Sequence, residues 1–439
     1  MARPGFGTDG VRGVANTELT AELAVALGRA AAQVLDATTF VVGRDTRQSS
    51  TMLQAALSAG MASGGADVVD LGVLPTAGVA YVAGRRGVPA AMVSASHNPY
   101  RDNGIKFFDS AGVKLMPDLE ARVEAVLGAP PPPGRVGSLF SDPDAAGEYP
   151  RHLVDSLEGR RLEGLHVVVD CANGAASAVA PQVLSELGAS VDAVFADPDG
   201  TNINDSCGST QPHRLAEEVV ARRADLGLAL DGDADRLVAV DHTGEICDGD
   251  VLLAIFAIDL EARGQLPGDA VVVTVMTNLG FRLAMARRGI SVHETPVGDR
   301  QVLAALDEAG LALGGEQSGH IVFRKLATTG DGVLTGILLA DAVVRAGRPL
   351  AGLAEGLVER VPQVLVNVAV ADPGRLTAAH GVWKAVAQVE EELGDGGRVL
   401  LRASGTEPLV RVMVEAPTPE IAADAAGRLS KVVEAALAG

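Results

Sequence analysis

Long apolar runs are absent from this chain of 439 residues. The longest that we find covers residues 251–258, far short of the ~20 residues that a membrane-spanning helix requires. The opening residues also lack the apolar core typical of a signal peptide. We therefore expect a cytoplasmic protein that has no membrane partner.

Cysteine is scarce, and positive charge is in the minority. The three cysteines, Cys171, Cys207 and Cys247, show no CxxC spacing, which argues against a disulfide framework and against a zinc site. The net charge of −20 argues against binding to nucleic acid, which needs a basic field. Any anionic small-molecule substrate must therefore be held by a few locally placed Arg and Lys side chains.

The length and the apolar content indicate several separate cores. At roughly 150 residues per domain, two to four domains are expected, and the hydrophobic content of 47% is enough to fill them. Strands and helices alternate along most of the chain, which predicts βαβ units and largely parallel sheets. We expect strands at 40–43, 67–71, 165–170, 226–230, 270–274 and 311–313, and helices at 49–61, 76–85, 177–187, 251–262 and 279–288.

The carboxyl-terminal part has a different pattern. Strands at 364–370, 398–401 and 409–415 and helices at 376–393 and 419–437 predict a small α+β domain. A proline-rich stretch at 129–134 indicates a stiff surface segment before a domain boundary. We predict three α/β domains with mixed, largely parallel sheets, covering 1–150, 151–248 and 249–361, followed by the α+β domain at 362–439.

A nucleophile is predicted where an apolar run ends in the segment Val93-Ser94-Ala95-Ser96-His97-Asn98-Pro99. Ligands of parallel sheets lie beyond the carboxyl ends of the strands, which is where Ser96 is expected. We interpret Ser96 as a hydroxyl that carries a phosphoryl group, with Asn103-Gly104-Ile105-Lys106 close behind it in the chain. A structural turn is the alternative for this segment when it is read alone.

A second polar loop holds three alternating carboxylates, Asp231, Asp233 and Asp235, directly after an apolar strand. Oxygen ligands of this kind suit a hard divalent cation. A calcium EF-hand is excluded, because Arg236 stands at the sixth loop position and His242 at the twelfth. An aspartyl-phosphatase nucleophile and a solvated acidic turn stay open as alternatives.

Electrostatics connects this loop to Ser96. A phosphoserine of charge about −2 beside three carboxylates would give a site of roughly −5. Each pair of like charges costs ~4 kcal/mol at 4 Å and an effective dielectric of about 20. A Mg²⁺ ion between the phosphate and the aspartates would relieve this repulsion.

Three further segments complete the set of candidate sites. Glu316, Ser318 and His320 alternate, so on an extended segment they would face one side and read a sugar, although a polar turn with a structural histidine is the alternative. The segment Arg402-Ala403-Ser404-Gly405-Thr406-Glu407-Pro408, with Arg411 beyond it, is typical of an anion cradle. The stretch 5–13 is too dense in glycine for a regular element, and Arg12 is its cation; a plain surface turn is the alternative.

Together these segments resemble the α-D-phosphohexomutase superfamily over essentially the whole chain. The stretches Phe6-Gly7-Thr8-Asp9-Gly10-Val11-Arg12-Gly13-Val14-Ala15-Asn16 and Gly315-Glu316-Gln317-Ser318-Gly319-His320 are most similar to its bacterial phosphoglucosamine mutase branch. The resemblance implies a heart-shaped protein of four domains with a central cleft, to which each domain contributes one loop.

The resemblance also implies a reaction and a role for each matching residue. Glucosamine 6-phosphate and glucosamine 1-phosphate would be interconverted through phospho-Ser96 and glucosamine 1,6-bisphosphate, on the route to UDP-N-acetylglucosamine for the cell wall. Ser96 and the three aspartates would bind one Mg²⁺ per subunit. Glu316 and Ser318 would read the sugar, and the phosphate that is not transferred would be held by Arg402, Ser404, Gly405, Thr406 and Arg411.

Several points stay open at this stage. The proton-transfer residue could be Lys106, His320, Arg12 or Arg236. The substrate could instead be a mannose or glucose phosphate, and a phosphosugar-binding regulator without catalysis is a more distant alternative. The sequence leaves the oligomeric state undecided, and a homodimer is one state that it allows.

Overall fold

The computed structural model describes residues 5–131, 134–404 and 408–437. The chain divides into two compact units, and each is described separately. The first comprises Met1–Thr274 with His293–Glu355, and the second comprises Val275–Val292 with Gly356–Gly439. None of the helices in the described residues is long and apolar enough to span a bilayer.

The first sheet of the larger unit has seven strands and is half parallel. Its order is β1-β2-β6-β5-β3-β4-β7; the pairs from β1 to β5 are antiparallel, and those from β5 to β7 are parallel. The strands are β1 (Phe6–Gly7), β2 (Gly10–Val14), β3 (Thr39–Arg44), β4 (Asp67–Val73), β5 (Ala90–Val93), β6 (Asp102–Phe108) and β7 (Leu139–Ser141). The helices of this part are α1 (Ala21–Leu35), α2 (Gln48–Ser63), α3 (Thr76–Arg86), α4 (Pro117–Ala125) and α5 (Pro143–Ala146).

The core of this sheet follows the alternation of side chains along its strands. Phe40 and Val42 lie in one buried cluster with leucines of α1 and α2, whereas Val41 is also fully buried but points to the opposite face. Helices therefore cover both faces, as an α/β sheet of this kind requires. Ser96 follows β5, in the interior of the sheet rather than at its edge.

The prediction that residues 5–13 form no regular element is wrong. They form a tight hairpin of β1 and β2, and β2 pairs with β6. Gly10 has a φ of 78°, and a Cβ there would lie 2.4 Å from the carbonyl oxygen of Ile105. The glycine therefore serves a tight turn and a close approach between strands, which local composition alone does not distinguish from a loop.

The second sheet has the order β12-β11-β10-β8-β9 and is also mixed. Its strands are β8 (His166–Asp170), β9 (Ser190–Val194), β10 (Leu226–Leu230), β11 (Leu237–Asp241) and β12 (Ile246–Cys247). The helices are α6 (Glu148–Asp155), α7 (Val179–Glu186) and α8 (His213–Arg222). All five residues of the central strand β10 are buried, and this strand delivers Asp231 at its end.

A third sheet completes the larger unit. In it β13 (Ala270–Thr274) pairs in parallel with β15 (Leu313–Gly315), and β15 pairs antiparallel with β16 (Ile321–Phe323). The helices here are α9 (Gly249–Ala262), α11 (Asp299–Ala309), α12 (Gly332–Ala346) and α13 (Leu350–Ala354), and a 3₁₀ turn covers Pro267–Asp269. β14 (Ser291–Thr295) lies where the chain passes between the two units.

The smaller unit contains an antiparallel sheet of order β17-β19-β18, packed against two helices. The strands are β17 (Gln363–Ala369), β18 (Arg398–Ala403) and β19 (Leu409–Glu415), and the helices are α14 (His380–Leu393) and α15 (Pro419–Leu437). Short 3₁₀ turns cover Pro373–Ala378 and Gly394–Gly396. Helix α10 (Leu279–Arg287) belongs to this unit too, although it precedes β17 by many residues in the chain.

Buried Glu415 explains why α10 joins the smaller unit. Its carboxylate accepts hydrogen bonds from the Asn278 side chain at 2.9 Å and from the Leu279 N–H at 3.0 Å, which caps the start of the helix. Arg398 donates to the same carboxylate at 2.5 Å and to the carbonyl oxygen of Val275 at 2.9 Å. The strands of the α+β part thus hold the segment before α10 through a buried, fully bonded ion pair.

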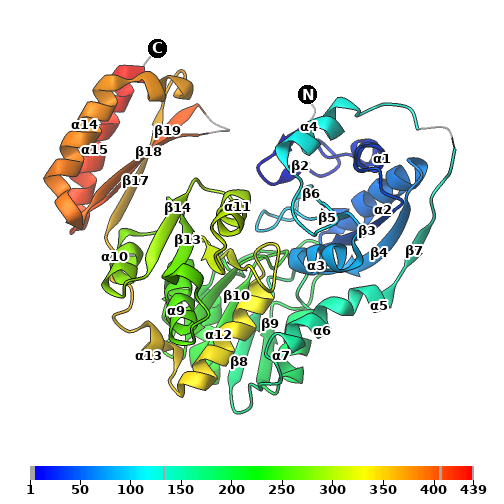
Figure 1. Cartoon of the computed structure of the whole chain (residues 1–439), viewed down its shortest axis with the longest axis horizontal. Helices are drawn as coiled ribbons and strands as arrows, with labels where there is room; N and C mark the ends of the chain where they lie inside the picture. The colour runs from blue at the N-terminus through cyan, green and yellow to red at the C-terminus, as the bar shows by residue number, and fades with distance from the viewer. Residues whose placement is uncertain (1–4, 132–133, 405–407, 438–439) are drawn as a thin grey trace. The chain divides into compact units, whose positions relative to one another are not determined.

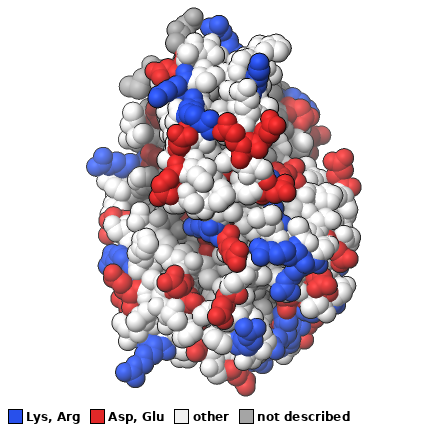
Figure 2. Space-filling model, turned by 90° about the vertical axis from the view of Figure 1, so that its left-hand side faces the viewer, with Lys and Arg blue, Asp and Glu red and all other residues white. Residues whose placement is uncertain are grey.

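The predicted fold class, α/β modules with mixed sheets followed by an α+β part, is confirmed (Figure 1). Several predicted element boundaries differ from the observed ones by one to four residues. For example, the strand predicted at 311–313 lies at Leu313–Gly315, and the helix predicted from residue 376 begins at His380 after a 3₁₀ turn. On the face shown in Figure 2, acidic and basic side chains are interspersed and form no broad field of either sign.

Candidate active site

Ser96 is buried, and its hydroxyl points at the carboxylate cluster. Ser96 Oγ donates to Asp231 Oδ2 at 2.6 Å and lies 3.3 Å from Nδ1 of His97. The Ser96 backbone has a φ of 51°, in the left-handed region that costs a non-glycine residue about 1–3 kcal/mol. This conformation persists because the surrounding groups hold it, so the loop is built to aim one hydroxyl.

The guanidinium group of Arg47 holds the Ser96 loop in place. It is fully buried, its Nε donates to Asp45 Oδ2 at 2.8 Å, and its two terminal nitrogens donate to four carbonyl oxygens of the loop. The fixed fork of a guanidinium can serve these acceptors together. The four carbonyl groups belong to Ser96, Asn98, Pro99 and Asp102.

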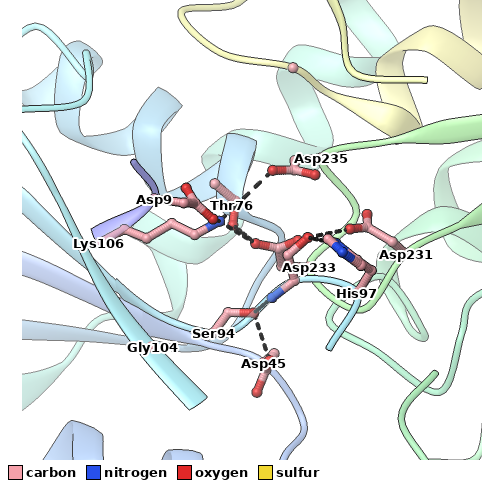
Figure 3. Close-up of polar contacts among 12 residues, drawn as sticks. Asp9, Asp45, Thr76, Ser94, His97, Gly104, Lys106, Asp231, Asp233 and Asp235 are labelled. Carbon is pink, nitrogen blue, oxygen red and sulfur yellow. Dashed lines mark hydrogen bonds and ion pairs between the residues drawn. The ribbon is translucent and has the colours of Figure 1, made fainter. Parts of the chain in front are cut away.

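Ser94 has a structural role in the same network. Its hydroxyl donates to Asp45 at 2.7 Å and accepts the Ser96 N–H at 3.0 Å (Figure 3). Ser94 is fully buried, with its hydroxyl turned toward Asp45 and not toward the carboxylate cluster. Of the two serines, Ser96 therefore carries the hydroxyl that faces the reactive groups.

The three aspartates predicted as metal ligands come together at the end of β10. Asp231, Asp233 and Asp235 are all buried, and one carboxylate oxygen from each lies within 4.8 Å of the others. Burial, reinforced by Asp235 and Asp233, holds the pKa of Asp231 well above its usual range. Such crowding of carboxylates is unfavourable unless a cation compensates it.

The donor set fits a divalent cation. Asp233 Oδ1 and Asp235 Oδ1 are buried and have no hydrogen-bond partner among the described residues. Orphaned carboxylate oxygens in a buried cluster are hard ligands of the type that Mg²⁺ prefers. When bound, Mg²⁺ would act as a Lewis acid on a transferring phosphoryl group.

Lys106, on β6, points into the same cluster (Figure 3). Its Nζ lies 2.9 Å from Asp233, 3.1 Å from Asp9 and 3.8 Å from Asp235. Burial opposes the charge, but Asp233 and Asp9 together raise the pKa of Lys106 above its usual value. Lys106 is therefore a cation here, suited to stabilise phosphoryl oxygens.

Asp9 organises the cations around the cluster. Burial raises the pKa of Asp9, but Lys106, Lys114 and Arg12 outweigh it and hold the pKa well below the usual value. Lys114 Nζ contacts Asp9 Oδ1 at 2.5 Å and Asp299 at 2.9 Å, and Arg12 forms an ion pair with Asp9 Oδ2. Asp9 thus fixes three cationic side chains at one edge of the site.

Arg236 and His97 lie beside the carboxylate cluster. Arg236 lies 3.7 Å from Asp235 Oδ1, and its buried Nε has no hydrogen-bond partner among the described residues. Burial opposes its charge, but Asp235 and Asp231 raise the pKa of Arg236. Burial and Arg236 lower the pKa of His97 to about 4, so His97 is neutral at pH 7.

His320 faces the carboxylate cluster instead of the solvent. Burial lowers its pKa, but the Asp235 carboxylate, 3.7 Å from Nδ1, raises it to about 9. The Gly330 N–H, however, points at Nε2 from 3.0 Å. A nitrogen that accepts a hydrogen bond carries no proton, so this geometry favours a neutral ring with its proton on Nδ1, toward Asp235.

The prediction that Glu316, Ser318 and His320 face one side is wrong. They occupy a tight turn between β15 and β16, in which Gly319 has a φ of 90°. A Cβ at Gly319 would lie 2.0 Å from the carbonyl oxygen of Leu237. His320 is consequently buried toward Asp235, while Ser318 is exposed and Glu316 half-buried.

Glu316 and Ser318 nevertheless remain neighbours. Ser318 Oγ donates to Glu316 Oε2 at 3.3 Å, and Glu316 Oε1 accepts the Gly298 N–H at 3.1 Å. The carboxylate is thus oriented from both sides. The pair presents an acceptor and a hydroxyl of the kind that recognises sugar hydroxyls or an ammonium group.

In the smaller unit, the predicted anion cradle contains two facing arginines. Arg402 on β18 and Arg411 on β19 are directly opposite each other in the sheet. Burial and Arg411 lower the pKa of Arg402. Like charges placed opposite each other are unfavourable, so the pair is suited to an anion that bridges them. The predicted residues Gly405 and Thr406 lie outside the described residues, and Ser404 is half-buried at the end of β18.

Sequence reasoning missed several residues that build this site. They are Asp9, Asp45, Arg47, Thr76, Lys114 and Asp299, and Thr76 Oγ1 donates to Asp233 Oδ2 at 2.6 Å. One signal was present: Gly43-Arg44-Asp45-Thr46-Arg47 is a charge-dense segment directly after a predicted strand. Lys114 and Asp299 gave no such signal, because only the tertiary fold brings them together.

Comparison with known proteins gives consistent matches along the chain. Four models of phosphoglucomutase/phosphomannomutase match in tandem: α/β/α domain I at residues 3–130, domain II at 148–244, domain III at 248–361 and the C-terminal domain at 365–432. Among solved structures, a phosphoglucomutase/phosphomannomutase family protein of Burkholderia thailandensis has a TM-score of 0.83 and 27% identity. That similarity covers 99% of this chain and 97% of the other.

Curated relatives narrow the family further. The phosphoglucosamine mutase of Streptomyces avermitilis is 53% identical over 449 residues, and that of Mycolicibacterium paratuberculosis is 52% identical over 441 residues. Each alignment covers 98% of this chain and 99% of the relative. By this similarity over nearly their full lengths, the chain belongs to the phosphoglucosamine mutase family.

Proposed function

We propose that this protein interconverts glucosamine 6-phosphate and glucosamine 1-phosphate, in the cytoplasm, on the route to UDP-N-acetylglucosamine. The observation that carries the proposal is the 2.6 Å hydrogen bond from Ser96 Oγ to Asp231, beside the buried Asp233 and Asp235. This arrangement supports a phosphoryl carrier next to a Mg²⁺ site. The family, whose relatives carry the name phosphoglucosamine mutase, supports the choice of sugar.

In the proposed reaction, two phosphoryl transfers balance each other. The first breaks the bond between phosphorus and Ser96 Oγ and forms a bond to the free hydroxyl of the sugar phosphate, giving glucosamine 1,6-bisphosphate. The second moves the other phosphoryl group back to Ser96 Oγ. Each transfer moves one proton between a sugar hydroxyl and the serine oxygen, so the enzyme returns to its starting state.

The roles of the charged side chains follow from their protonation. Lys106, Arg12 and Arg236 are cations in this arrangement and would stabilise the phosphoryl oxygens during transfer. His320 Nδ1 lies 3.7 Å from Asp235 Oδ2, so we assign it to orienting that carboxylate.

Phosphate holding is assigned to the smaller unit. Arg402 and Arg411, with Ser404, Gly405 and Thr406, would bind the phosphate that is not transferred, through paired charges of the type that suits a phosphate. A mutase needs such a second anion site, whereas a phosphatase needs only the first. Glu316 and Ser318 would contact the sugar, with Glu316 accepting from the amine.

A coupled assay tests the substrate. We expect turnover of glucosamine phosphate to exceed that of mannose and glucose phosphates in the presence of Mg²⁺ and a bisphosphate primer. Equal or faster turnover of mannose phosphate would contradict the assignment. Phosphate found on Ser96 by mass spectrometry is the second expected result, and turnover without a label at any stage would contradict the phosphoserine mechanism.

A further inference from the structure

A groove of about 540 Å³ lies outside the Ser96 site. One wall is helix α3, a second is the end of α6, and the third is the segment that follows β16. These walls come from three different matches, domains I, II and III, and the junctions of domains are frequent places for ligand sites. The groove has no assigned role in the proposed reaction.

A stacked pair of rings lines this groove. Tyr81 on α3 and His152 on α6 lie with ring centroids 4.1 Å apart and planes 16° from parallel. The His152 ring is fixed because Nε2 lies 2.9 Å from the carbonyl oxygen of Leu326, and burial lowers its pKa, so it is neutral at pH 7. On α3, Ala77, Ala80 and Gly84 also line the groove, so the helix presents small residues beside Tyr81 along this wall.

The charged side chains of the groove are mainly basic. Arg85, Arg324 and Lys325 line it. Arg324 is paired with Asp307 through two hydrogen bonds of 2.5 Å and 3.2 Å, whereas Lys325 is exposed with no carboxylate within ion-pair distance among the described residues. Arg85 lies 3.5 Å from Glu148 in an exposed pair, which contributes little and can be exchanged for a stronger anion. The one acidic lining residue, Asp331, is turned inward, where it accepts from Tyr149 at 2.9 Å. Lys325, which has no such partner among the described residues, and the weakly paired Arg85 favour an anion at this position.

We propose that this groove binds a nucleotide. Its base would contact the Tyr81 and His152 rings, and its phosphates would meet Lys325 and Arg85. Stacking on aromatic side chains and charge-assisted bonds to phosphate are the two interactions that such a ligand needs, and the groove offers both.

Both principal walls of the groove are hydrogen-bonded to the loop that carries Asp231, Asp233 and Asp235. At the start of α3, Thr76 donates through its N–H to the Asp233 carbonyl oxygen at 3.0 Å and through Oγ1 to the Asp233 carboxylate. After the other wall, the Gly332 N–H donates to the Ala234 carbonyl oxygen at 2.9 Å, and Gly330 bonds to His320. A nucleotide that draws these walls together would therefore change kcat more than KM for the sugar phosphate. This second statement rests on the proposed mutase function, whereas binding itself does not.

Calorimetry on the full chain tests binding directly, with ADP as the probe. We expect ADP to bind in the presence of saturating glucosamine 6-phosphate and excess Mg²⁺, and inorganic phosphate to bind more weakly because it has no base. Lys325→Glu should weaken ADP binding at least about tenfold, since it reverses a charge that meets phosphate. Tyr81→Ala should weaken ADP but not inorganic phosphate.

The matched control is Lys384→Glu, an exposed lysine on α14 that has no contact with the groove. It should leave ADP binding unchanged. Failure of ADP to bind, its displacement by glucosamine 6-phosphate, or equal binding by the Lys325 variant would overturn the proposal. If inorganic phosphate binds as tightly as ADP, the two rings do not contribute to binding, and the proposal of a nucleotide site is wrong.

The activity measurement separates the two proposals. With excess Mg²⁺, ADP should change kcat more than KM in the unmodified chain and leave the Lys325→Glu variant unaffected. If ADP binds but no mutase turnover is seen under any condition, the groove assignment stands and the proposed function fails. If ADP binds without altering kcat, the coupling through Thr76 and Gly332 is wrong.

Discussion

Arg47 donates a 2.8 Å hydrogen bond to the carbonyl oxygen of Ser96, the residue whose hydroxyl meets Asp231. The same guanidinium serves three further carbonyl groups of the loop. The strained φ of Ser96 is therefore maintained by a residue that touches neither substrate nor metal. We regard Arg47 as the main positioning residue of the proposed nucleophile.

Replacing this guanidinium by an ammonium tests that role. Arg47→Lys keeps the charge but loses the fork, so several carbonyl oxygens would be left unsatisfied and Ser96 would shift. We expect kcat to fall about 10²-fold, the loss typical of a misplacement of about 1 Å, with little change in KM. Arg135→Lys, at an exposed ion pair with Asp67, is the matched control and should behave as the unmodified chain. A rise in KM at constant kcat would contradict the positioning role.

Replacing each of the two serines of the loop should have a different kind of effect. Ser96→Ala should remove the phosphoryl label and nearly all turnover while substrate binding persists. Ser94→Ala should keep the label but lower thermal stability by about 1–3 kcal/mol, because Asp45 and the Ser96 N–H lose a buried partner. Mass spectrometry and thermal unfolding distinguish these results. Substantial activity in Ser96→Ala would show that another group carries the phosphoryl.

The carboxylate cluster should depend on a cation for its stability. Asp231→Asn removes one of three crowded charges, so we expect it to raise Tm in EDTA. It should also reduce the gain in Tm that Mg²⁺ gives to the unmodified chain, because one ligand charge is lost. Differential scanning calorimetry with and without Mg²⁺ measures both effects. A Mg²⁺ effect that is equal in the two proteins would argue against this cluster as the metal site.

Replacing an arginine of the pair in the smaller unit should weaken phosphate binding with little change in the stability of the fold. Arg411→Ala should weaken both glucosamine phosphates about tenfold to a hundredfold, since a charge-assisted phosphate contact is lost. It should leave the label on Ser96 in place. Titration calorimetry provides the affinities. Loss of the label in this variant would contradict a role restricted to holding phosphate.

Because of Asp331, we expect the free energy of unfolding of the larger unit to depend on pH. Burial raises its pKa to about 6, although it accepts bonds from Leu334 at the start of α12 and from Tyr149. The folded protein thus binds this proton more tightly than the unfolded chain. The associated stability is fully present below the ordinary pKa of about 4 and is lost as pH rises to about 6.

Asp331→Asn tests this effect, because an amide can accept the same bonds without ionising. Relative to the unmodified chain, the variant should gain about 2–3 kcal/mol between pH 4 and pH 7. Asp142→Asn is the control, since Asp142 caps α5 with its pKa lowered, so this substitution should show the opposite sign. Denaturant titrations at several pH values measure both. A difference between Asp331→Asn and the parent that does not vary with pH would contradict the assignment.

The sequence predicted the parts of this protein in which chemistry is local. Ser96 and the aspartates of β10 stand at the ends of apolar strands, so their positions were predictable from a few residues on either side. The hairpin at residues 5–13 was not, because Gly10 meets Ile105, about a hundred positions away. His320 was predicted as a site residue but given the wrong direction, since the turn that redirects it depends on the approach of Gly319 to Leu237.

The residues that support the site were the hardest to find. Arg47 and Asp45 neutralise each other, and Lys114 meets Asp9 and Asp299 across long separations in sequence. The charge-dense segment that holds Asp45 and Arg47 is only a weak signal, because any surface turn can contain an arginine and an aspartate, and Lys114 has no local signature at all. Only the fold shows that these charges are buried and satisfied.

The bond from Glu415 to the start of α10 bears on how this protein can be divided. Cutting the chain between the matched domain III and C-terminal domain would leave Glu415 and Arg398 without the Asn278, Leu279 and Val275 groups that they bind. A fragment that begins near residue 362 would therefore expose a polar cluster that is otherwise satisfied, and its fold would be weakened. Domain exchange between relatives should carry residues 275–292 together with the C-terminal segment, even though the two are separated in the gene.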